Sequence, residues 1–227
     1  MEYGIALVAI FVVSFLLGSI PFGVVVSKFM FNDDVREHGS GNIGTTNMMR
    51  TYGKKAGVIV FLCDFFKGVL AGLVALGVYC ALDGANMLPA AESITFPFVT
   101  VDCLLDIATS ISFAGCVWGH IFSPWLNFKG GKGIATAVGN EFVMYGPIPA
   151  IIELLIFAIL VPITKYVSFG SVAAALACVP IAVIVFWGNP VAVIFASAGA
   201  LTVVWAHRGN IKRLLNGTER RIGAKKE

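Results

Sequence analysis

Long apolar runs separated by short polar stretches are the feature that most constrains the fold of this chain. The first run, from Gly4 to Ser27, contains no charged residue, and about 20 apolar residues are enough for a helix to cross a bilayer. Of the 227 residues, 58% are hydrophobic and 13% are charged, and the mean hydropathy is +0.87. These values exclude a soluble globular domain, so we expect an integral membrane protein embedded in the lipid bilayer.

The apolar runs predict an all-α, polytopic membrane protein with about seven transmembrane helices. The first run has no basic segment before it and no small-residue cleavage site after it, so we expect it to be retained as a helix. No long linker or internal repeat divides the sequence, and residues 1–227 are therefore expected to form a single membrane domain. The expected spans cover residues 4–27, 56–82, 104–122, 134–148, 150–164, 169–187 and 190–206.

Basic residues fall almost entirely in alternate loops of this arrangement. With the N-terminus outside, the cytoplasmic loops and the C-terminal tail hold every Lys and Arg except Lys67. Positive charge marks the cytoplasmic side of membrane proteins, so we expect the N-terminus outside and the C-terminus in the cytoplasm. The opposite side, including a loop at 83–103 with Pro89 and Pro97, carries the acidic residues Asp83, Glu92, Asp102 and Asp106.

The cysteines do not form a metal-binding pattern. The chain has five cysteines, Cys63, Cys80, Cys103, Cys116 and Cys178, and none of them forms a closely spaced pair. All except Cys103 lie within apolar runs, where a cysteine acts as a small hydrophobic residue. We therefore expect no metal site and no cofactor.

A proline interrupts the first expected span. The stretch GSIPFG, from Gly18 to Gly23, lies near its cytoplasmic end and is followed by Lys28. Proline frees backbone groups that a neighbouring side chain or a water-lined site must satisfy. A simple kink and a break that faces the substrate both remain open.

The second polar stretch is HGSGNIGTTNMMR, from His38 to Arg50. Its letters fit a dinucleotide-binding fingerprint, but no strand precedes it, so the context excludes that function. Its glycines suit a concave nest of backbone N–H groups for an anion, with Arg50 supplying charge. A plain glycine-rich turn is the alternative. Neutral donors would come from Ser40, Asn42, Thr45, Thr46 and Asn47.

The third stretch, GHIFSPWLNFKGGKGIATAVG, places two lysines among three glycines at positions 129 to 133. The spacing does not fit a nucleotide-binding P-loop, because position 126 is Leu and position 133 is Gly. Close backbone approach, inward N–H groups, an ammonium group and the start of a helix all favour an anion. Lysines that only anchor the topology are the alternative. His120 could equally be a structural histidine at the membrane edge or a catalytic one.

The fourth stretch, HRGNIKRLLNGTERRIG, follows the last expected span. A basic helix held to anionic lipid would explain its arginines, but it gives no role to His207, Asn210 and Glu219. A separate pair, Asp64 and Lys67, lies on one face of the second span. A structural ion pair is the first interpretation of this pair, ahead of a proton relay.

These stretches, together with CDFFKG around Asp64, resemble the motifs of the bacterial acyl-phosphate:glycerol-3-phosphate acyltransferases, the PlsY family, in order from residue 18 to residue 223. The resemblance implies a seven-helix enzyme of the bacterial plasma (inner) membrane with its active site on the cytoplasmic side. Such an enzyme transfers a fatty acyl group from acyl phosphate to the sn-1 hydroxyl of glycerol 3-phosphate, giving 1-acyl-glycerol 3-phosphate and phosphate, the first step of phospholipid synthesis. An upstream enzyme that forms acyl phosphate is a possible partner, and no nucleic acid is expected.

Carried over by position, the resemblance implies three groups of site residues. The catalytic candidates are Ser40, Lys132, His207 and Asn210. The candidates for binding substrate or phosphate are Gly41, Asn42, Gly44, Asn47, Arg50, Lys129, Gly130, Gly131, Gly133 and Arg213. The supporting residues are Asp64, Lys67, His120 and Glu219. Departures from the family pattern at Cys63, Ser123-Pro124-Trp125 and Ala206 leave the selectivity for the acyl donor open.

Two other functions compete with this hypothesis. A transporter for an anionic metabolite would also need basic loops, but it is expected to bind at the bilayer midplane between related halves, and no repeat is present. Acyltransferases that use coenzyme A or acyl-carrier thioesters carry a histidine followed five residues later by aspartate. Here those positions hold Ile43, Trp125 and Lys212, so we expect acyl phosphate as donor and little use of acyl-CoA.

Overall fold

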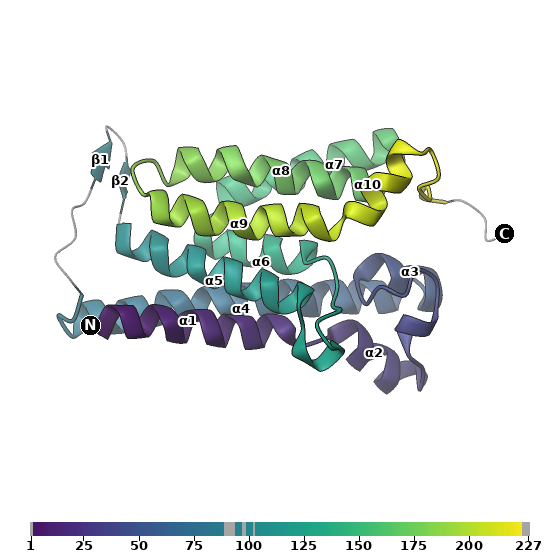
Figure 1. Cartoon of the computed structure of the whole chain (residues 1–227), viewed down its shortest axis with the longest axis horizontal. Helices are drawn as coiled ribbons and strands as arrows, with labels where there is room; N and C mark the ends of the chain where they lie inside the picture. Colours follow the sequence, from purple (N-terminus) through teal and green to yellow (C-terminus); the bar gives the residue numbers. More distant parts are fainter. Residues whose placement is uncertain (1, 89–93, 97–98, 102, 224–227) are drawn as a thin grey trace.

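The computed structural model describes residues 2–88, 94–96, 99–101 and 103–223. Figure 1 shows long helices running side by side along the long axis of the molecule, with the first helix, α1 (Glu2–Ser19), beginning at one end of the bundle and the last, α10 (Arg208–Leu215), lying at the other. Among the described residues, five helical segments are long and apolar enough to cross a membrane, or six if the bent pair α9 (Pro190–Ala206) and α10 (Arg208–Leu215) is one span. The expected helical membrane protein is therefore confirmed, whereas a count of seven spans stays a prediction.

The first span is broken at the proline that interrupts it. Helix α1 covers Glu2–Ser19 and α2 covers Phe22–Phe31, and the two pass as one 30-residue span. Pro21 has no N–H group to donate to the carbonyl oxygen of Leu17, so the helical ladder cannot continue through it. At the break the carbonyl oxygen of Ile20 accepts hydrogen bonds from Phe22 N–H (3.1 Å) and from Lys67 Nζ (2.8 Å). The expected interruption at GSIPFG is thus a full break between two helices.

A short helix, α3 (Thr45–Tyr52), leads through Gly53 into the long helix α4 (Lys54–Gly84). Gly53 has φ 90°, which glycine adopts without strain. With 31 residues, α4 is about 47 Å long at 1.5 Å per residue. It therefore extends beyond the hydrocarbon core, and carries its first turn to the same end of the bundle as α3 (Figure 1).

Helix α5 (Cys103–Ile121) is the centre of the bundle. It lies against α1, α4, α6 and α9, and most of its residues are buried. Glycines bring α1 and α5 into backbone contact, since a Cβ on Gly18 would lie 2.0 Å from the carbonyl oxygen of Cys116. Small residues at helix contacts are typical of membrane bundles.

Helices α7 (Pro147–Thr164), α8 (Val167–Val185) and α9 (Pro190–Ala206) form the second side of the bundle. Helix α10 (Arg208–Leu215) follows α9 at an angle of 53°. The observed bounds of α4, α5, α7, α8 and α9 agree with five of the expected spans to within three residues at each end. The hydrophobic pattern therefore located these helices well.

Helix α6 is the main difference from the expected spans. It covers Ile134–Met144, 11 residues, where a span at 134–148 was expected. Its length is about 16 Å, roughly half of the hydrocarbon core. Gly146, at φ 80°, separates it from α7. Most of α6 is buried against α4 and α5, so it packs inside the bundle as a short helix.

The connection between α4 and α5 also contains a small hairpin, which lies outside the helical bundle and leaves the expected all-α class confirmed. Strand β1 (Ile94–Phe96) pairs antiparallel with β2 (Val99–Val101) in the connection between α4 and α5. Two short 3-10 turns, η1 (Val35–Glu37) and η2 (Pro124–Leu126), lie in loops at the other end. Of the residues expected in the outer loop, Pro89, Glu92, Pro97 and Asp102 lie outside the described residues.

Candidate active site

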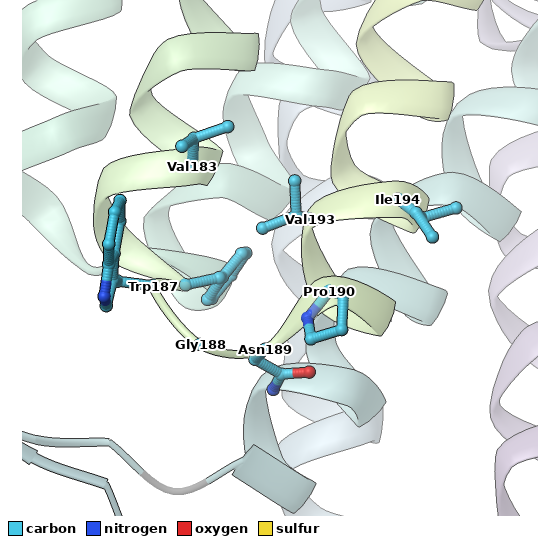
Figure 2. Close-up of a pocket in the computed structure, with 8 residues that line it drawn as sticks. Val183, Trp187, Gly188, Asn189, Pro190, Val193 and Ile194 are labelled. Carbon is cyan, nitrogen blue, oxygen red and sulfur yellow. The ribbon is translucent and has the colours of Figure 1, made fainter.

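The polar stretches singled out from the sequence gather at one end of the bundle, where α2, α3, α10 and the loop before α6 meet (Figure 1). A pocket at the opposite end, at the turn between α8 and α9, is lined almost wholly by apolar side chains (Figure 2). The amide side chain drawn there, Asn189, is already used, because its Nδ2 donates to the carbonyl oxygen of Cys103 (2.8 Å) and its Oδ1 caps α9. That pocket has no cationic side chain among its described lining residues to hold an anion.

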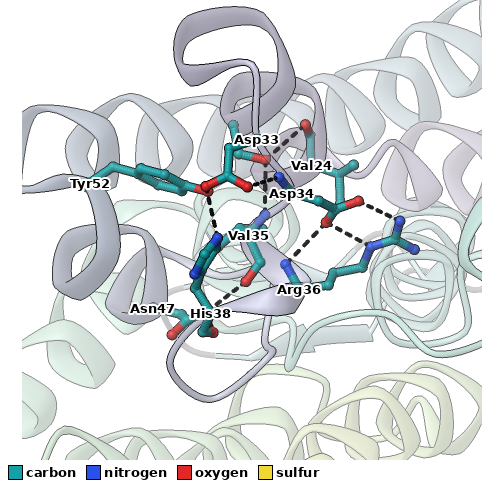
Figure 3. A network of polar contacts seen from close by, with 9 residues as sticks. Val24, Asp33, Asp34, Val35, Arg36, His38, Asn47 and Tyr52 are labelled. Atoms are coloured by element: carbon teal, nitrogen blue, oxygen red, sulfur yellow. Dashed lines mark hydrogen bonds and ion pairs between the residues drawn. The ribbon is translucent and has the colours of Figure 1, made fainter.

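Two aspartates hold the loop that follows α2 (Figure 3). Tyr52 Oη donates to Asp33 Oδ2 at 2.9 Å, and His38 Nε2 lies 2.8 Å from the same oxygen. Arg36 makes a two-pronged contact with Asp34, at 2.9 and 2.6 Å. Hydrogen bonding from Arg36 lowers the pKa of Asp34 to about 2. The aspartate therefore stays ionised at neutral pH, and the loop keeps these contacts.

Asn47, buried in α3, organises the glycine-rich loop. Its Oδ1 accepts the N–H of Ser40 at 3.0 Å. Its Nδ2 donates at 3.2, 3.0 and 2.9 Å to the carbonyl oxygens of Val35, His38 and Asn42. Because both polar atoms of Asn47 are used inside the protein, this residue shapes the loop and does not present a free donor to a ligand.

The two glycines before and after Ser40 allow this tight turn. Gly39 and Gly41 have φ 61° and 68°, and a Cβ on Gly39 would lie 2.3 Å from Asn47 Oδ1. Asn42 Oδ1 accepts the N–H of Gly44 at 2.9 Å, which starts α3. The hydroxyl group of Ser40 and the guanidinium of Arg50 are on exposed residues of the loop and of α3. These two groups remain available for a substrate.

The loop at 129–133 differs in one respect from expectation. Its N–H groups were expected to point at an anion, but Gly130 N–H donates to the carbonyl oxygen of Ile121 (3.0 Å) and Gly131 N–H to that of His120 (3.1 Å). A Cβ on Gly130 would lie 2.0 Å from the His120 oxygen. These two glycines therefore pack the loop onto the end of α5.

Free N–H groups occur slightly later, at the start of α6. Gly133, at φ 85°, is the N-cap residue, and the first hydrogen bond of the helix runs from Ala137 N–H to its carbonyl oxygen (2.7 Å). The N–H groups that precede Ala137 in this turn have no acceptor inside the helix. Lys132 lies beside this helix N-terminus, where an anion is favoured.

Lys132 is the centre of a cluster of charges drawn from three separate polar stretches. Burial lowers the pKa of Lys132 to about 8; Glu219 opposes this shift, whereas Arg213 and Arg50 add to it. Arg50 in turn lies within electrostatic range of Arg213, Glu219 and Arg220. The structure thus brings together three cations predicted from the sequence, whereas Lys129 is exposed.

His207, between α9 and α10, is buried beside this cluster and within electrostatic range of Lys132. Its Nδ1 lies 2.8 Å from the carbonyl oxygen of Val203. A carbonyl oxygen can only accept, so Nδ1 carries a proton, and the neutral ring has an unprotonated Nε2. His207 is therefore arranged as a proton acceptor.

Glu219 ties the C-terminal segment to α10 and α8. It accepts hydrogen bonds from Asn210 Nδ2 (2.7 Å), Arg213 Nε (2.7 Å) and Ser168 Oγ (2.8 Å). Burial alone would raise the pKa of Glu219, but these three hydrogen bonds outweigh it and the pKa is lowered. Ser168 was missed from the sequence, because a single serine at the start of an apolar helix carries no signal of its own.

The intramembrane charges form the expected pair. Asp64 Oδ1 and Lys67 Nζ are 2.8 Å apart, and both side chains are buried. His120 is also buried, next to them and below the loop at 129–133. The ion-pair interpretation is therefore confirmed.

Comparison with known proteins decides the family. The family profile described as glycerol-3-phosphate acyltransferase matches residues 8–217. The chain belongs to this family of PlsY-type glycerol-3-phosphate acyltransferases. A glycerol-3-phosphate acyltransferase of Clostridioides difficile is 40% identical over 220 residues, which cover 97% of each chain. One of Syntrophotalea carbinolica is 37% identical over 93% of this chain and 95% of its own.

Solved structures agree with this family. The crystal structure of the integral membrane glycerol 3-phosphate acyltransferase PlsY in its glycerol 3-phosphate form has a TM-score of 0.77 and 32% identity over 96% of both chains. Its lysophosphatidic acid form has a TM-score of 0.75 and 31% identity over 96% of this chain and 95% of that one. The resemblance seen in the motifs is confirmed, and the chain is an integral membrane glycerol-3-phosphate acyltransferase.

Proposed function

We propose that this acyltransferase takes its fatty acyl group from acyl phosphate and transfers it to the sn-1 hydroxyl of glycerol 3-phosphate. The products are 1-acyl-glycerol 3-phosphate and inorganic phosphate, and the reaction is the first step of phospholipid synthesis. No cofactor takes part. The substrate supply comes from an upstream reaction that makes acyl phosphate, and the product is a lipid that leaves into the bilayer.

One observation carries the proposal: Lys132, just before the N-terminus of α6, lies within electrostatic range of Arg50, Arg213 and the buried ring of His207. Two phosphorylated substrates need concentrated positive charge, and one of them also needs contact with the membrane. Charged hydrogen bonds to phosphate oxygens are strong in such a partly buried site. A thioester donor would bring no phosphate to the reacting carbonyl group and would leave part of this charge unused.

The residues take the following roles. Arg50, Lys132, Arg213 and the N–H groups at the start of α6 bind the phosphate groups and stabilise the negative charge that develops on the reacting carbonyl oxygen and on the leaving phosphate. Ser40 and Asn210 orient the substrates through neutral hydrogen bonds. Gly41, Asn42, Gly44, Asn47, Gly130 and Gly131 shape the two loops, and Lys129 attracts anions from the exposed rim.

Transfer is direct. The glycerol hydroxyl oxygen attacks the carbonyl carbon of acyl phosphate, the new ester C–O bond forms, and the bond from that carbon to the phosphate oxygen breaks. The hydroxyl proton goes to His207 Nε2 or to a substrate phosphate oxygen. Acyl phosphate is already an activated donor, so positioning and electrostatics supply most of the rate enhancement.

The site lies on the cytoplasmic side of the bacterial plasma membrane, with the N-terminus outside and the C-terminus in the cytoplasm. Support comes from the charge distribution, because the basic residues gather at the end of the bundle that holds α2, α3 and α10. Six segments can cross the membrane when α9 and α10 count as one span. The proposed seventh crossing is the one by which α6 and the loops beside it bring the chain back through the membrane between α5 and α7. Soluble glycerol 3-phosphate then reaches the site from the cytoplasm.

The test uses purified full-length protein in lipid nanodiscs with glycerol 3-phosphate and either palmitoyl phosphate or palmitoyl-CoA. We expect palmitoyl phosphate to give 1-palmitoyl-glycerol 3-phosphate at a rate at least about a hundredfold above that from palmitoyl-CoA. A hundredfold is roughly the loss of rate expected when one buried charged group has no partner in the transition state. Comparable rates with both donors would refute the proposed donor. Uptake of glycerol 3-phosphate into proteoliposomes without turnover would instead support a carrier.

A further inference from the structure

Lys67 joins three elements behind the active-site loop. Its Nζ atom lies 2.8 Å from Asp64 Oδ1 in α4, 2.8 Å from the carbonyl oxygen of Ile20 at the break between α1 and α2, and 3.0 Å from His120 Nδ1 in α5. The ammonium group also lies 5.6 Å from the centre of the Phe22 ring, the first residue after the break. All three of its hydrogen-bonding directions are therefore taken, by a carboxylate of its own helix, by the backbone at the break and by a side chain of α5.

These contacts determine the tautomer of His120. An ammonium group has only donors, so His120 Nδ1 must accept from Lys67. Thr136 Oγ1, 3.3 Å from the same nitrogen, can donate to it as well. The neutral ring therefore carries its proton on Nε2. This is the opposite of His207, whose proton is on Nδ1.

The Nε2 side of the His120 ring lies directly against Gly131. A Cβ on Gly131 would be 2.1 Å from Nε2, 3.0 Å from Cδ2 and 3.1 Å from Cε1, so all three nearest atoms belong to this one ring. The backbone makes a second contact, from Gly131 N–H to the carbonyl oxygen of His120. The ring position thus sets the position of Gly131, the residue immediately before Lys132.

We propose that His120, held by Lys67 with its proton on Nε2, is the positioning residue for the loop at 129–133, and that Lys67 couples this loop to the break in the first span. A shift of the ring moves Gly131 and with it Lys132. The inference rests on the proposed role of Lys132 in binding phosphate. It adds a function for the intramembrane ion pair: the pair holds the phosphate-binding loop in register with the broken helix.

The decisive experiment uses Gly131→Ala and Gly130→Ala, each alone and combined with His120→Ala, in nanodiscs. Gly131→Ala should lower kcat/KM about a hundredfold, the effect of moving a binding group by about 1 Å. Removing the ring removes the collision, so the double variant should be no worse than His120→Ala alone. Gly130→Ala is the matched control. Its Cβ collides with the backbone oxygen of His120, which no side-chain change can relieve, so its loss should persist in the double variant.

A second variant keeps the inference testable if Gly131→Ala does not fold. In Lys67→Met the His120 ring loses the hydrogen-bond donor on its Nδ1, while the new side chain keeps the apolar part of the lysine. The loop at 129–133, which on this proposal holds one of the two substrate phosphates, then moves. We expect KM for one substrate, acyl phosphate or glycerol 3-phosphate, to rise about tenfold while the other changes less than twofold, because only one phosphate depends on this loop. A fold defect alone would lower the active fraction and leave both KM values unchanged. Lys67→Arg should recover part of the loss.

The outcomes separate this inference from the proposed donor. Losses that multiply in the Gly131→Ala and His120→Ala double variant, or unchanged KM values in Lys67→Met, would overturn the inference while wild-type turnover with acyl phosphate still stands. If the wild type does not use acyl phosphate, the donor proposal fails. In that case the Kd for glycerol 3-phosphate and for inorganic phosphate is measured for the same variants. The inference then requires that His120→Ala relieve the weaker binding caused by Gly131→Ala but not that caused by Gly130→Ala.

Discussion

Three cations from three polar stretches meet at the active site, and single substitutions test them. We expect Lys132→Ala and Arg50→Ala each to lower kcat/KM by on the order of a hundredfold, because each removes a charged hydrogen bond to a phosphate oxygen in a partly buried site. The protein should still elute as a folded species and unfold at a similar temperature. Wild-type kinetics in either variant would assign that residue to membrane anchoring alone.

The lowered pKa of Lys132 predicts a pH dependence. Burial lowers the pKa to about 8, so the free enzyme loses this positive charge as the pH rises through 8, well below the range in which an exposed lysine deprotonates. We expect kcat/KM, which reports the free enzyme, to fall above about pH 8 in the wild type.

Lys132→Arg is the control for this pH dependence. Arginine keeps its charge at all these pH values, so its lower activity should be flat between pH 7 and pH 10. A decline above pH 8 that persists in Lys132→Arg would assign the titration to another group.

At the level of residues, the sequence predicted which side chains meet but not what each one does. The lysines and glycines at 129–133 predicted a loop whose N–H groups bind an anion. The N–H groups of Gly130 and Gly131 are instead used to pack that loop onto α5. Asn47 was predicted to bind substrate and instead holds the loop around Ser40. Such roles depend on distances between segments far apart in the chain, and no local pattern contains those distances.

At the level of elements, hydrophobic length located five spans, but it did not identify α6 as a short helix. The run from Ile134 to Thr164 is mostly apolar, with two glutamates, Glu141 and Glu153, and with Gly146, Pro147 and Pro149 between its halves, so its pattern is compatible with two spans. Only the packing shows that α6 ends at Met144 and is enclosed by its neighbours. An interruption of the first span was predictable, because Pro21 removes a backbone donor, but the sequence left a kink and a break equally open.

Close packing of α1 on α5 predicts a sharp difference between two glycines. A Cβ on Gly18 would lie 2.0 Å from a backbone oxygen of α5, whereas a Cβ on Gly77 in α4 would meet nothing within 4 Å. We expect Gly18→Ala to destabilise the protein by about 1–3 kcal/mol through overpacking. Gly77→Ala should be neutral or slightly stabilising. Thermal unfolding in detergent measures both, and equal melting temperatures would show that the two helices are less closely packed.

At the level of the whole molecule, the orientation is testable with impermeant thiol reagents. In a cysteine-free background, Asn86→Cys places a thiol just after α4 and Asn216→Cys places one just after α10, at opposite ends of the bundle. We expect the first to react in intact cells and the second only after permeabilisation. The reverse pattern would place the active site outside.

Direct transfer makes a prediction for the whole catalytic cycle. Incubation with acyl phosphate alone should leave no acylated protein, and thiol reagents should not inhibit, because the acyl group passes straight from one substrate to the other. Intact-protein mass spectrometry detects such an adduct. An ester on Ser40 or a thioester on any cysteine that passes its acyl group to glycerol 3-phosphate would show a two-step mechanism.

The enclosure of α5 also has a consequence for how the protein is made. Among the described segments that could cross a membrane, Cys103–Leu126, which contains α5, is the least hydrophobic and the most deeply buried. Lipid is a poor environment for its serines and threonine, and α9, which covers one side of it, is synthesised much later. During biogenesis we therefore expect α5 to be inserted before α9 is present to cover it, so its polar side chains are exposed to lipid in a partly assembled bundle. A chain that stops before α9 should be degraded faster than the full-length protein in a pulse-chase experiment.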